Sequence, residues 1–399
     1  MNQLLSRFLL IAVLSCRVGL TKEPQHLPCP APPGSAEPNL VAGDDGKLYL
    51  SWIESKKPTA TLRFATWNGS GWNEPKTIAT GNDWFVNWAD FPSLAVLPNG
   101  TLAAHWLQKS SSGTYSYDVI VSVSRDGGDT WSKPASPHTD GTPSEHGFAS
   151  LVPAGDGFGV FWLDGRAMKK PGDNMSLRFT TLSEGGQFGK ELLIDDRVCE
   201  CCQTSAVRLA DSGFLVTYRD RSPKEVRDIG AAIVRNGAGQ RRFRLNADGW
   251  TIKGCPVNGP ALATRGKTVV AAWPTQGEDG FAVRVRFSSD ASQTWGKVAA
   301  VNTRETIGRV DVAMLNDSQA VVSWIESGDK TTIRCRLVTA DGTMNPSRRI
   351  ADTTTARSSG FPRIAVLGKH VYAAWTEPGS PSQVKSARIP IASLTETAK

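Results

Sequence analysis

Apolar and polar positions along this chain follow a pattern that returns seven times. In each copy, a run of alternating small or apolar residues is followed by a turn and then by a second apolar run, which ends in an aromatic residue. The seven aromatic residues, spaced 51 to 56 positions apart, are Trp52, Trp106, Trp162, Tyr218, Trp273, Trp324 and Trp375. A period of this length predicts a repeated supersecondary unit, as in arrays and propellers.

Each copy belongs to a unit with the pattern of a four-stranded antiparallel sheet. Its first two runs are joined by a tight turn, such as Asp-Asp-Gly at 44–46 or Asp-Ser-Gly at 211–213, and these residues favour a β-hairpin. A third alternating run follows, for example at 118–124, and a shorter fourth run usually closes the unit. Four strands in a unit of this length predict one blade of a β-propeller.

Seven units predict an all-β fold, a β-propeller of four-stranded antiparallel blades. Seven blades are favoured and six blades are the alternative. The seventh unit has no clear fourth run, so we expect residues near the mature N-terminus to supply that strand and fasten the ring.

Composition agrees with a large, folded β-protein. The chain has 399 residues, which is long for one ordinary core, but a ring of units that pack on their neighbours avoids that limit. Hydrophobic residues make up 40% and charged residues 21%, a balance that excludes a disordered chain. The formal net charge of +7 is spread along the chain, without a long basic run or a known nucleic-acid motif. We therefore expect no nucleic-acid partner, whereas an anionic small ligand is compatible with this charge.

The N-terminus has the pattern of an export signal. Arg7 precedes a short apolar run that ends at Cys16, and this run is too short to span a bilayer. Residues 13–16 resemble a lipoprotein box with Cys16 as the lipidated residue; an ordinary cleavable signal is the alternative. We expect a signal peptide at 1–16, a Pro-rich tether at 17–37 and one propeller domain at 38–399. The expected product is a monomer that is periplasmic, anchored to the outer membrane only through the lipid, or secreted.

One short motif occurs between the third and fourth runs of two units. The second unit contains Ser124, Asp126, Gly128, Thr130 and Trp131 in the pattern Ser-x-Asp-x-Gly-x-Thr-Trp. The fifth unit repeats it with Ser288, Asp290 and Trp295, and with Ser292 in the glycine position. In such a turn the Asp carboxylate accepts backbone N–H bonds, Gly permits a positive φ, and Trp packs under the next blade.

On this motif and the sevenfold period, the chain resembles the sialidase (neuraminidase) superfamily of Asp-box, or BNR-repeat, propellers. The resemblance implies that the Asp boxes are structural and lie on the face opposite the active site. It also implies an arginine triad on the carboxylate of sialic acid, an Asp acid/base and a Tyr–Glu nucleophile pair. The chain departs from the family in its first blade, where Glu37-Pro-Asn-Leu40 replaces the motif Phe/Tyr-Arg-Ile/Val-Pro.

The propeller topology predicts where a site lies. The first strand of each inner hairpin begins on the face where the second strand ends, so the residues that flank these hairpins meet at one mouth of the channel. Several of these residues are charged or polar, which predicts a polar site there. The candidate ligand-binding residues are Arg219, Arg221, Arg309, Arg363, Gln203, Asn258 and His146. The candidate acid/base residues are Asp90, Asp220, Asp311 and Glu326.

Two interpretations of these residues remain open. In the functional one, Arg219, Arg309 and Arg363 hold an anionic group, because an arginine fork binds a carboxylate with two hydrogen bonds, and a carboxyl group transfers the proton. In the structural one, the same charges pair with one another across neighbouring blades. No nucleophile follows from the motifs, and Tyr218 is expected in the core.

Four cysteines are expected to lie close together. Cys199, Cys201 and Cys202 precede the fourth inner hairpin, and Cys255 lies at nearly the equivalent place in the fifth unit. Disulfides are expected in an exported protein, with Cys255 bonded to Cys201 or Cys202, and Cys199 within reach of Cys29. The alternative is a cofactor site for Cu or Zn on the four sulfurs.

Three functions follow from these features. The first is a glycoside hydrolase of the sialidase type that acts on an acidic glycan at the channel mouth. The second is a non-catalytic envelope propeller that binds an anionic ligand or a partner protein. The third is a metal or redox accessory protein that depends on the cysteines.

Overall fold

The computed structural model describes residues 23–170, 172–235, 238–277 and 280–395. The expected signal peptide, Cys16 and the start of the expected tether lie outside these residues. Within the described ranges, no helix is long and apolar enough to cross a membrane.

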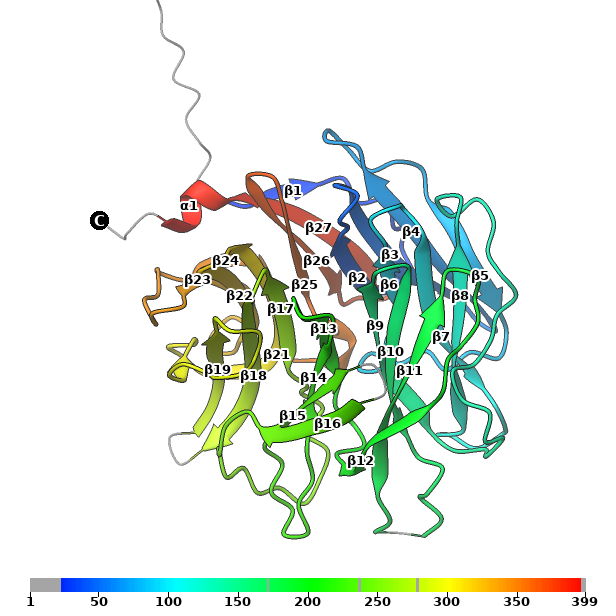
Figure 1. The fold of residues 1–399 in the computed structure, drawn as a ribbon. Coiled ribbons are helices and arrows are strands. Elements are labelled where there is room, and N and C mark those ends of the chain that lie inside the picture. Colours follow the sequence, from blue (N-terminus) through cyan, green and yellow to red (C-terminus); the bar gives the residue numbers. More distant parts are fainter. Residues whose placement is uncertain (1–22, 171, 236–237, 278–279, 396–399) are drawn as a thin grey trace, which may run out of the picture.

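Seven antiparallel sheets form a ring, and this confirms the seven-bladed propeller over the six-bladed alternative (Figure 1). Blade one contains β2 (Ser35–Ala42), β3 (Leu48–Lys56), β4 (Thr59–Trp67) and β5 (Lys76–Gly81). Blade two contains β6 (Ser93–Val96), β7 (Leu102–Lys109) and β8 (Tyr117–Ser124). Blade three contains β9 (His146–Ala154), β10 (Gly157–Asp164), β11 (Met175–Ser183) and β12 (Leu192–Val198). Blade four contains β13 (Ser205–Arg208), β14 (Phe214–Arg219), β15 (Ile229–Arg235) and β16 (Ala238–Arg244). Blade five contains β17 (Ala261–Arg265), β18 (Thr268–Gly277), β19 (Gly280–Ser288) and β20 (Ala299–Ala300). Blade six contains β21 (Thr306–Asn316), β22 (Gln319–Glu326), β23 (Thr332–Thr339) and β24 (Arg348–Asp352).

The seventh blade closes the ring with both ends of the chain. It contains β25 (Arg363–Leu367), β26 (His370–Glu377), β27 (Gln383–Pro390) and, as its outer strand, β1 (Gln25–Leu27). β1 pairs with β27 so that Gln25 lies opposite Arg388 and Leu27 opposite Ser386. The N-terminal residues thus supply the missing strand, as expected. The propeller consequently begins ahead of residue 38, within the segment that was expected to be a tether.

Two units do not supply a fourth strand of their own, and the sequence had indicated this only for the seventh. The second sheet has three strands, and a single bridge between Val121 and Ala135 stands where a fourth strand would pair. The seventh unit ends in the short helix α1 (Ile391–Thr395) in place of a fourth strand. Both features leave the ring of seven intact, because neighbouring blades contact one another mainly through their first strands.

The repeated aromatic residues form the cores between the blades. Trp52, Trp162, Trp273, Trp324 and Trp375 are fully buried, and Trp106 and Tyr218 are nearly so. Trp324, for example, packs with Val283 and Val285 of the preceding blade. The pattern that returns seven times in the sequence therefore reflects one buried aromatic position that each of the seven blades repeats.

Both Asp boxes form the predicted turn. The Asp126 carboxylate accepts the hydroxyl of Ser124 at 2.8 Å and the N–H and hydroxyl of Thr130 at 2.9 and 2.6 Å. Gly128 has a φ of 87°, and Trp131 packs edge-on against Phe64 of the first blade. This turn follows the last residue of β8, at the opposite end of that strand from Tyr117.

The second box has the same bonds around Asp290. The N–H of Ser292 donates to Ser288 Oγ at 2.9 Å, and Ser292 takes the glycine position with a φ of 69°. Trp295 packs at the edge of the core between blades four and five. Both boxes are structural, as the resemblance implied, but Trp131 and Trp295 pack toward the preceding blade and not, as was expected, under the next one.

Candidate functional site

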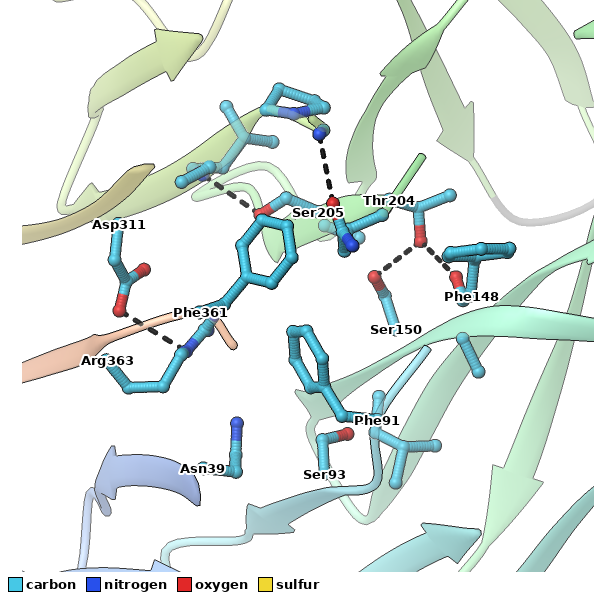
Figure 2. A pocket seen from close by; sticks show the side chains of 18 of the residues that line it. Asn39, Phe91, Ser93, Phe148, Ser150, Thr204, Ser205, Asp311, Phe361 and Arg363 are labelled. Carbon is cyan, nitrogen blue, oxygen red and sulfur yellow. Dashed lines mark hydrogen bonds and ion pairs between the residues drawn. The ribbon is translucent and has the colours of Figure 1, made fainter. Parts of the chain in front are cut away.

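A cavity of about 180 Å³ lies in the channel between the first strands (Figure 2). Polar side chains of these strands connect each blade to the next. Asn39 accepts the N–H of Leu94 at 3.2 Å, and Ser205 accepts that of Leu262 at 2.9 Å. Figure 2 also shows Thr204 between Ser150 and the carbonyl of Phe148. The wall of the channel is thus built from inter-blade hydrogen bonds.

Asp311 belongs to this set of connections. Its carboxylate accepts the N–H groups of Val312 and Ile364 and lies 3.3 Å from the Nε atom of Arg363 (Figure 2). Burial raises the pKa of Asp311, although Arg363 and the two N–H groups oppose this. Asp311 and Arg363 therefore join blades six and seven, and the acid/base role expected for Asp311 is not supported.

Glu326 has a structural position that recurs around the ring. In five blades the residue opposite the anchor tryptophan on the third strand is basic; in the first blade this pair is Trp52 and Arg63. The carboxylate of Glu54 lies between them, 3.0 Å from the indole nitrogen and 3.4 Å from Arg63. Glu326 has the equivalent position, buried and 3.6 Å from Arg334. It therefore balances a cation inside its blade and lines neither the channel cavity nor the cavity at the mouth.

Two of the arginines expected to hold an anion are bonded to backbone carbonyls. Arg219, which is 1% exposed, donates to the carbonyls of Asn258, Arg227 and Pro274. Its guanidinium also lies over the ring of Trp250.

Arg309 is held in a similar way. It donates to the carbonyls of Ala356 and Gly360 and lies over the ring of Trp88. Burial lowers its pKa to about 10. The arginine clamp predicted for Arg219, Arg309 and Arg363 is not formed, because the first two are bonded to the backbone and the third to Asp311.

The other polar candidates do not lie together. Arg221 and Asp220 are near the surface of blade four, Gln203 and Asn258 are near the channel, and His146 is in a buried cluster. Arg221 pairs with Glu225 and Glu200 at 3.0 and 3.5 Å. Asp220 lines a separate surface pocket together with Asp195 and Arg242. Burial raises the pKa of Asp220. The structure therefore does not bring Asp220 together with Asp90.

Gln203 and Asn258 are structural connections near the channel. Gln203 donates to the carbonyl of Ala89, two blades away, and accepts the N–H of Gly259 at 3.0 Å. Asn258 accepts the N–H of Arg309 at 2.8 Å and donates to the carbonyl of Ile307. Both amides are thus occupied by the backbone.

His146 lies in a buried cluster with His138, and the two rings stack at 3.8 Å. Asp118, Asp140 and Asp164 approach the ring of His146 to 3.1, 3.4 and 3.8 Å. Burial alone would lower the pKa of His146, but these carboxylates outweigh it and raise that pKa. The donor set has metal-ligand chemistry, yet Arg166 lies 2.7 Å from Asp164 and neutralises part of its charge. His146 does not line the mouth of the channel.

A second cavity, of about 440 Å³, opens at the mouth and is called here the mouth pocket. Asp90, Ala89 and Phe148 line both this pocket and the channel cavity. Its other lining residues are Phe85, Asn87, Trp88, Tyr115, Tyr117, Glu145, Glu200, Cys201, Cys255, Val257 and Arg357. Of the predicted acid/base residues, Asp90 alone lies in this pocket.

Two carboxyl groups meet at one phenol in the mouth pocket. The hydroxyl oxygen of Tyr117 lies 2.7 Å from Glu145 and 3.0 Å from Asp90, whose other oxygen accepts the N–H of Phe148. Burial raises the pKa of Asp90 to about 8. Burial, with a contribution from Glu200, raises the pKa of Glu145 to about 7. Both groups therefore hold or exchange a proton near neutral pH.

Aromatic rings form one side of the mouth pocket. Phe85 stacks on Tyr117 with ring centroids 4.1 Å apart, and Tyr115 packs against the outer edge of Phe85. Tyr115 is 62% exposed, the most exposed large aromatic side chain of the described residues. A flat apolar surface thus stands beside the carboxyl groups.

Four cysteines gather beside this pocket, and two of them, Cys201 and Cys255, line it. The sulfur of Cys199 lies 3.7 Å from that of Cys201 and 3.8 Å from that of Cys202, and the sulfur of Cys255 accepts a hydrogen bond from Cys201. Hydrogen bonds from Cys201 and Cys202, together with Arg227, hold the pKa of Cys199 well below its usual range, whereas burial raises the pKa of Cys202 to about 12.

The predicted disulfides are not formed in the structure. All six cysteines of the described residues are free thiols, and the sulfur separations are far beyond a bond of about 2.05 Å. Cys29 packs instead in the core between blades seven and one, so it cannot pair with Cys199. Cys335 is a buried single thiol.

Sequence reasoning missed Tyr115 and Tyr117 and did not select Glu145. The signal was available, because residues between the second and third strands reach the same mouth as the ends of the inner hairpins. Tyr117 is the first residue of β8, and Glu145 directly precedes β9. Including the loop between the second and third strands would have found Tyr115 and Tyr117, whereas Glu145 already lay among the residues that flank the inner hairpins.

Comparison with known proteins supports the fold. No protein-family model matches the chain, and a search of curated proteins found no match. Among solved structures, the chain is similar to the BP39L lectin of Burkholderia pseudomallei, with 13% identity, a TM-score of 0.66 and coverage of 90% of this chain and 96% of the lectin. It is similar to the polysaccharide lyase Uly1, with 9% identity, a TM-score of 0.53 and coverage of 94% and 93%. It is also similar to the Hadza microbial sialidase Hz136, with 13% identity, a TM-score of 0.50 and coverage of 84% and 74%. At these identities the likeness establishes a sialidase-like β-propeller fold.

Proposed function

We propose that this sialidase-like β-propeller binds a glycan in the mouth pocket. The observation that carries the proposal is the placement of the exposed ring of Tyr115 and the stacked ring of Phe85 beside Glu145, Glu200 and Asp90. A sugar presents C–H groups on the faces of its ring and hydroxyl groups around its edge. The aromatic side of the pocket matches the former, and the carboxyl groups match the latter.

The specificity in this proposal comes from the rings and the carboxyl groups. Recognition of an acidic sugar was expected from an arginine clamp, but Arg219 and Arg309 are bonded to carbonyls. The one arginine on the wall of the mouth pocket is Arg357, within the described residues. The lectin, lyase and sialidase among the similar structures carry names that refer to carbohydrate binding or cleavage, which favours a glycan over a protein partner.

A second candidate function, glycoside hydrolysis, is favoured by the contacts of Tyr117. Its hydroxyl oxygen joins Asp90 and Glu145, so the two bonded carboxyl oxygens lie within about 6 Å of each other. Retaining glycosidases place their two carboxyl groups about 5 to 5.5 Å apart. A carboxyl group with a pKa of about 7, as in Glu145, suits proton donation at neutral pH. The set also contains the residue types that the family resemblance implied, which are an Asp, a Tyr and a Glu.

A glycan array followed by calorimetry tests the first candidate. The array includes neutral and sialylated oligosaccharides, and the strongest ligand is then titrated into the wild type, Tyr115→Ala and Tyr115→Phe. Because phenylalanine keeps the ring, we expect binding to be kept in Tyr115→Phe and weakened at least tenfold in Tyr115→Ala. Binding that is equal in all three proteins would place the ligand elsewhere.

Fluorogenic aryl glycosides, a sialoside among them, test the second candidate. Turnover that is lost in both Glu145→Gln and Asp90→Asn would support hydrolysis in the mouth pocket. Glycan binding without turnover of any of these substrates would leave the protein a binding propeller and reject the second candidate.

A further inference from the structure

The four cysteines at the edge of the mouth pocket come from two neighbouring blades. Cys199, Cys201 and Cys202 lie in the connection between β12 and β13, which leads into blade four. Cys255 lies in the connection between β16 and β17, which leads into blade five. The sulfur atoms of Cys199, Cys201 and Cys202 form a compact group, and Cys255, more than fifty positions away in the sequence, reaches this group at Cys201.

The sulfur separations are those of ligands around one metal ion. The sulfur atoms of Cys199, Cys201 and Cys202 all lie within 4.8 Å of one another, and two of their separations are 3.7 and 3.8 Å. A tetrahedral zinc ion with Zn–S bonds of about 2.3 Å requires sulfur atoms about 3.8 Å apart. A single disulfide would join two of these atoms and would leave the mutual approach of three unexplained.

The surroundings of the cluster suit thiolate ligands. The buried guanidinium of Arg227 lies 3.0 Å from the sulfur of Cys199, where it offsets negative charge. The N–H of Asn258 donates to the sulfur of Cys202 at 3.4 Å. Donors of this kind orient the ligands of metal sites and stabilise their charge. Arg227 is itself fixed by Glu225 at 2.7 Å, so its position does not depend on the sulfurs alone.

We propose that Cys199, Cys201 and Cys202 bind one thiophilic metal ion, either Zn²⁺ or Cu⁺, and that Cys255, beside Cys201, completes the site as the fourth ligand. Both ions prefer cysteine thiolates, whereas Mg²⁺ and Ca²⁺ prefer oxygen ligands. The ion fastens the connection before blade four to the connection before blade five. Cys201 and Cys255 also line the mouth pocket, so this ion borders the proposed glycan site without depending on it.

Metal analysis of the purified full-length protein tests this proposal. The protein is prepared without chelator or reductant, and zinc and copper are measured per chain by mass spectrometry. We expect about one equivalent of one of these metals in the wild type. Cys335→Ser is the matched control, because Cys335 is a buried thiol in β23 of blade six, and it should keep the metal.

Two variants keep the test decisive. Cys202→Ser removes a buried ligand, whereas Cys255→Ser removes an exposed one and should leave the fold intact, as judged by circular dichroism. We expect at least a tenfold loss of metal affinity in each, measured with a chromogenic Zn²⁺ chelator and with a Cu⁺ chelator under reducing conditions. The native ion is the one that the protein binds more tightly, so its chelator must be added at a higher concentration to remove it.

Two results would overturn the proposal. The first is a disulfide between Cys201 and Cys255, found by peptide mapping of wild-type protein that contains no metal. The other is a fully reduced wild type that takes up neither Zn²⁺ nor Cu⁺ any better than Cys255→Ser.

Discussion

The hydroxyl group of Tyr117 lies 2.7 Å from the carboxyl group of Glu145, deep in the wall of the mouth pocket. The same oxygen lies 3.0 Å from Asp90. A phenol has one proton to donate, so its second contact requires a proton on one of the carboxyl groups. Asp90, whose pKa is about 8, is the group that holds it at neutral pH. The phenol and the two acids thus form one hydrogen-bonded unit.

Replacing Tyr117 by phenylalanine should destabilise the protein and disable this unit. The change leaves Asp90 and Glu145 without their shared partner, and an unsatisfied buried polar group costs about 1 to 3 kcal/mol. Urea unfolding measures the loss of stability, and calorimetry measures the glycan affinity, which we expect to fall. A variant as stable as the wild type would show that the two acids do not depend on the phenol.

The stability of the protein should fall as the pH rises through the range in which Asp90 stays protonated. Asp90 has a pKa of about 8 in the folded state and about 3.9 when unfolded. Between about pH 4 and pH 8 the unfolded state therefore holds fewer protons, and stability falls by up to about 1.4 kcal/mol per pH unit. Glu145 adds to this fall, because its pKa is also raised.

Asp90→Asn separates the contribution of Asp90 from that of Glu145. Asparagine has no proton to lose in this range, so the variant should lose less stability than the wild type between pH 5 and pH 8. Urea unfolding at both pH values measures the difference. Equal losses in the two proteins would mean that Asp90 is ionised in the folded state.

Glu326→Gln should affect stability and leave ligand binding unchanged. The substitution removes the carboxylate that lies 3.6 Å from Arg334, an ion pair beyond hydrogen-bond distance, so we expect a loss of about 1 kcal/mol. Because Glu326 lies inside its blade, the glycan affinity should equal that of the wild type. If the Glu326→Gln variant is folded but does not bind the glycan, Glu326 is part of the binding site and this prediction is wrong.

Removing β1 should open the ring. A chain that begins at Pro28 loses the pairing of β1 with β27 and the burial of Leu27, which alone contributes about 1.5 to 3 kcal/mol. A chain that begins at Glu23 keeps the strand and is the matched control. Thermal unfolding of both should show a lower Tm for the shorter chain only. Equal Tm values would mean that β1 does not hold the ring closed.

The sequence was sufficient for the fold because its signals are local. The hairpin turns and the hydrogen bonds around Asp126 depend on neighbours within one blade, and the anchor aromatic residues return at a regular spacing along the chain. The position of β1 followed from counting strands, since the seventh unit lacked one.

The site was harder to predict because it depends on register and on side-chain direction. The pairing of Trp324 with Arg334 gives Glu326 its cation, and only the strand register shows this pairing. From the sequence, Arg219 was expected to be available for a ligand. Its partners are backbone carbonyls, and because every residue has a carbonyl, the sequence does not show which of them an arginine will contact. The approach of Cys255 to Cys201 did follow from topology, whereas the free state of the thiols did not.

The most direct test of the account is a calorimetric titration of the strongest array glycan into the wild type, Tyr115→Ala, Glu145→Gln and Glu326→Gln. If the mouth pocket binds the glycan, affinity falls at least tenfold in Tyr115→Ala and Glu145→Gln and is unchanged in Glu326→Gln. Equal affinity in all four proteins, each shown to be folded, would contradict the assignment of the mouth pocket.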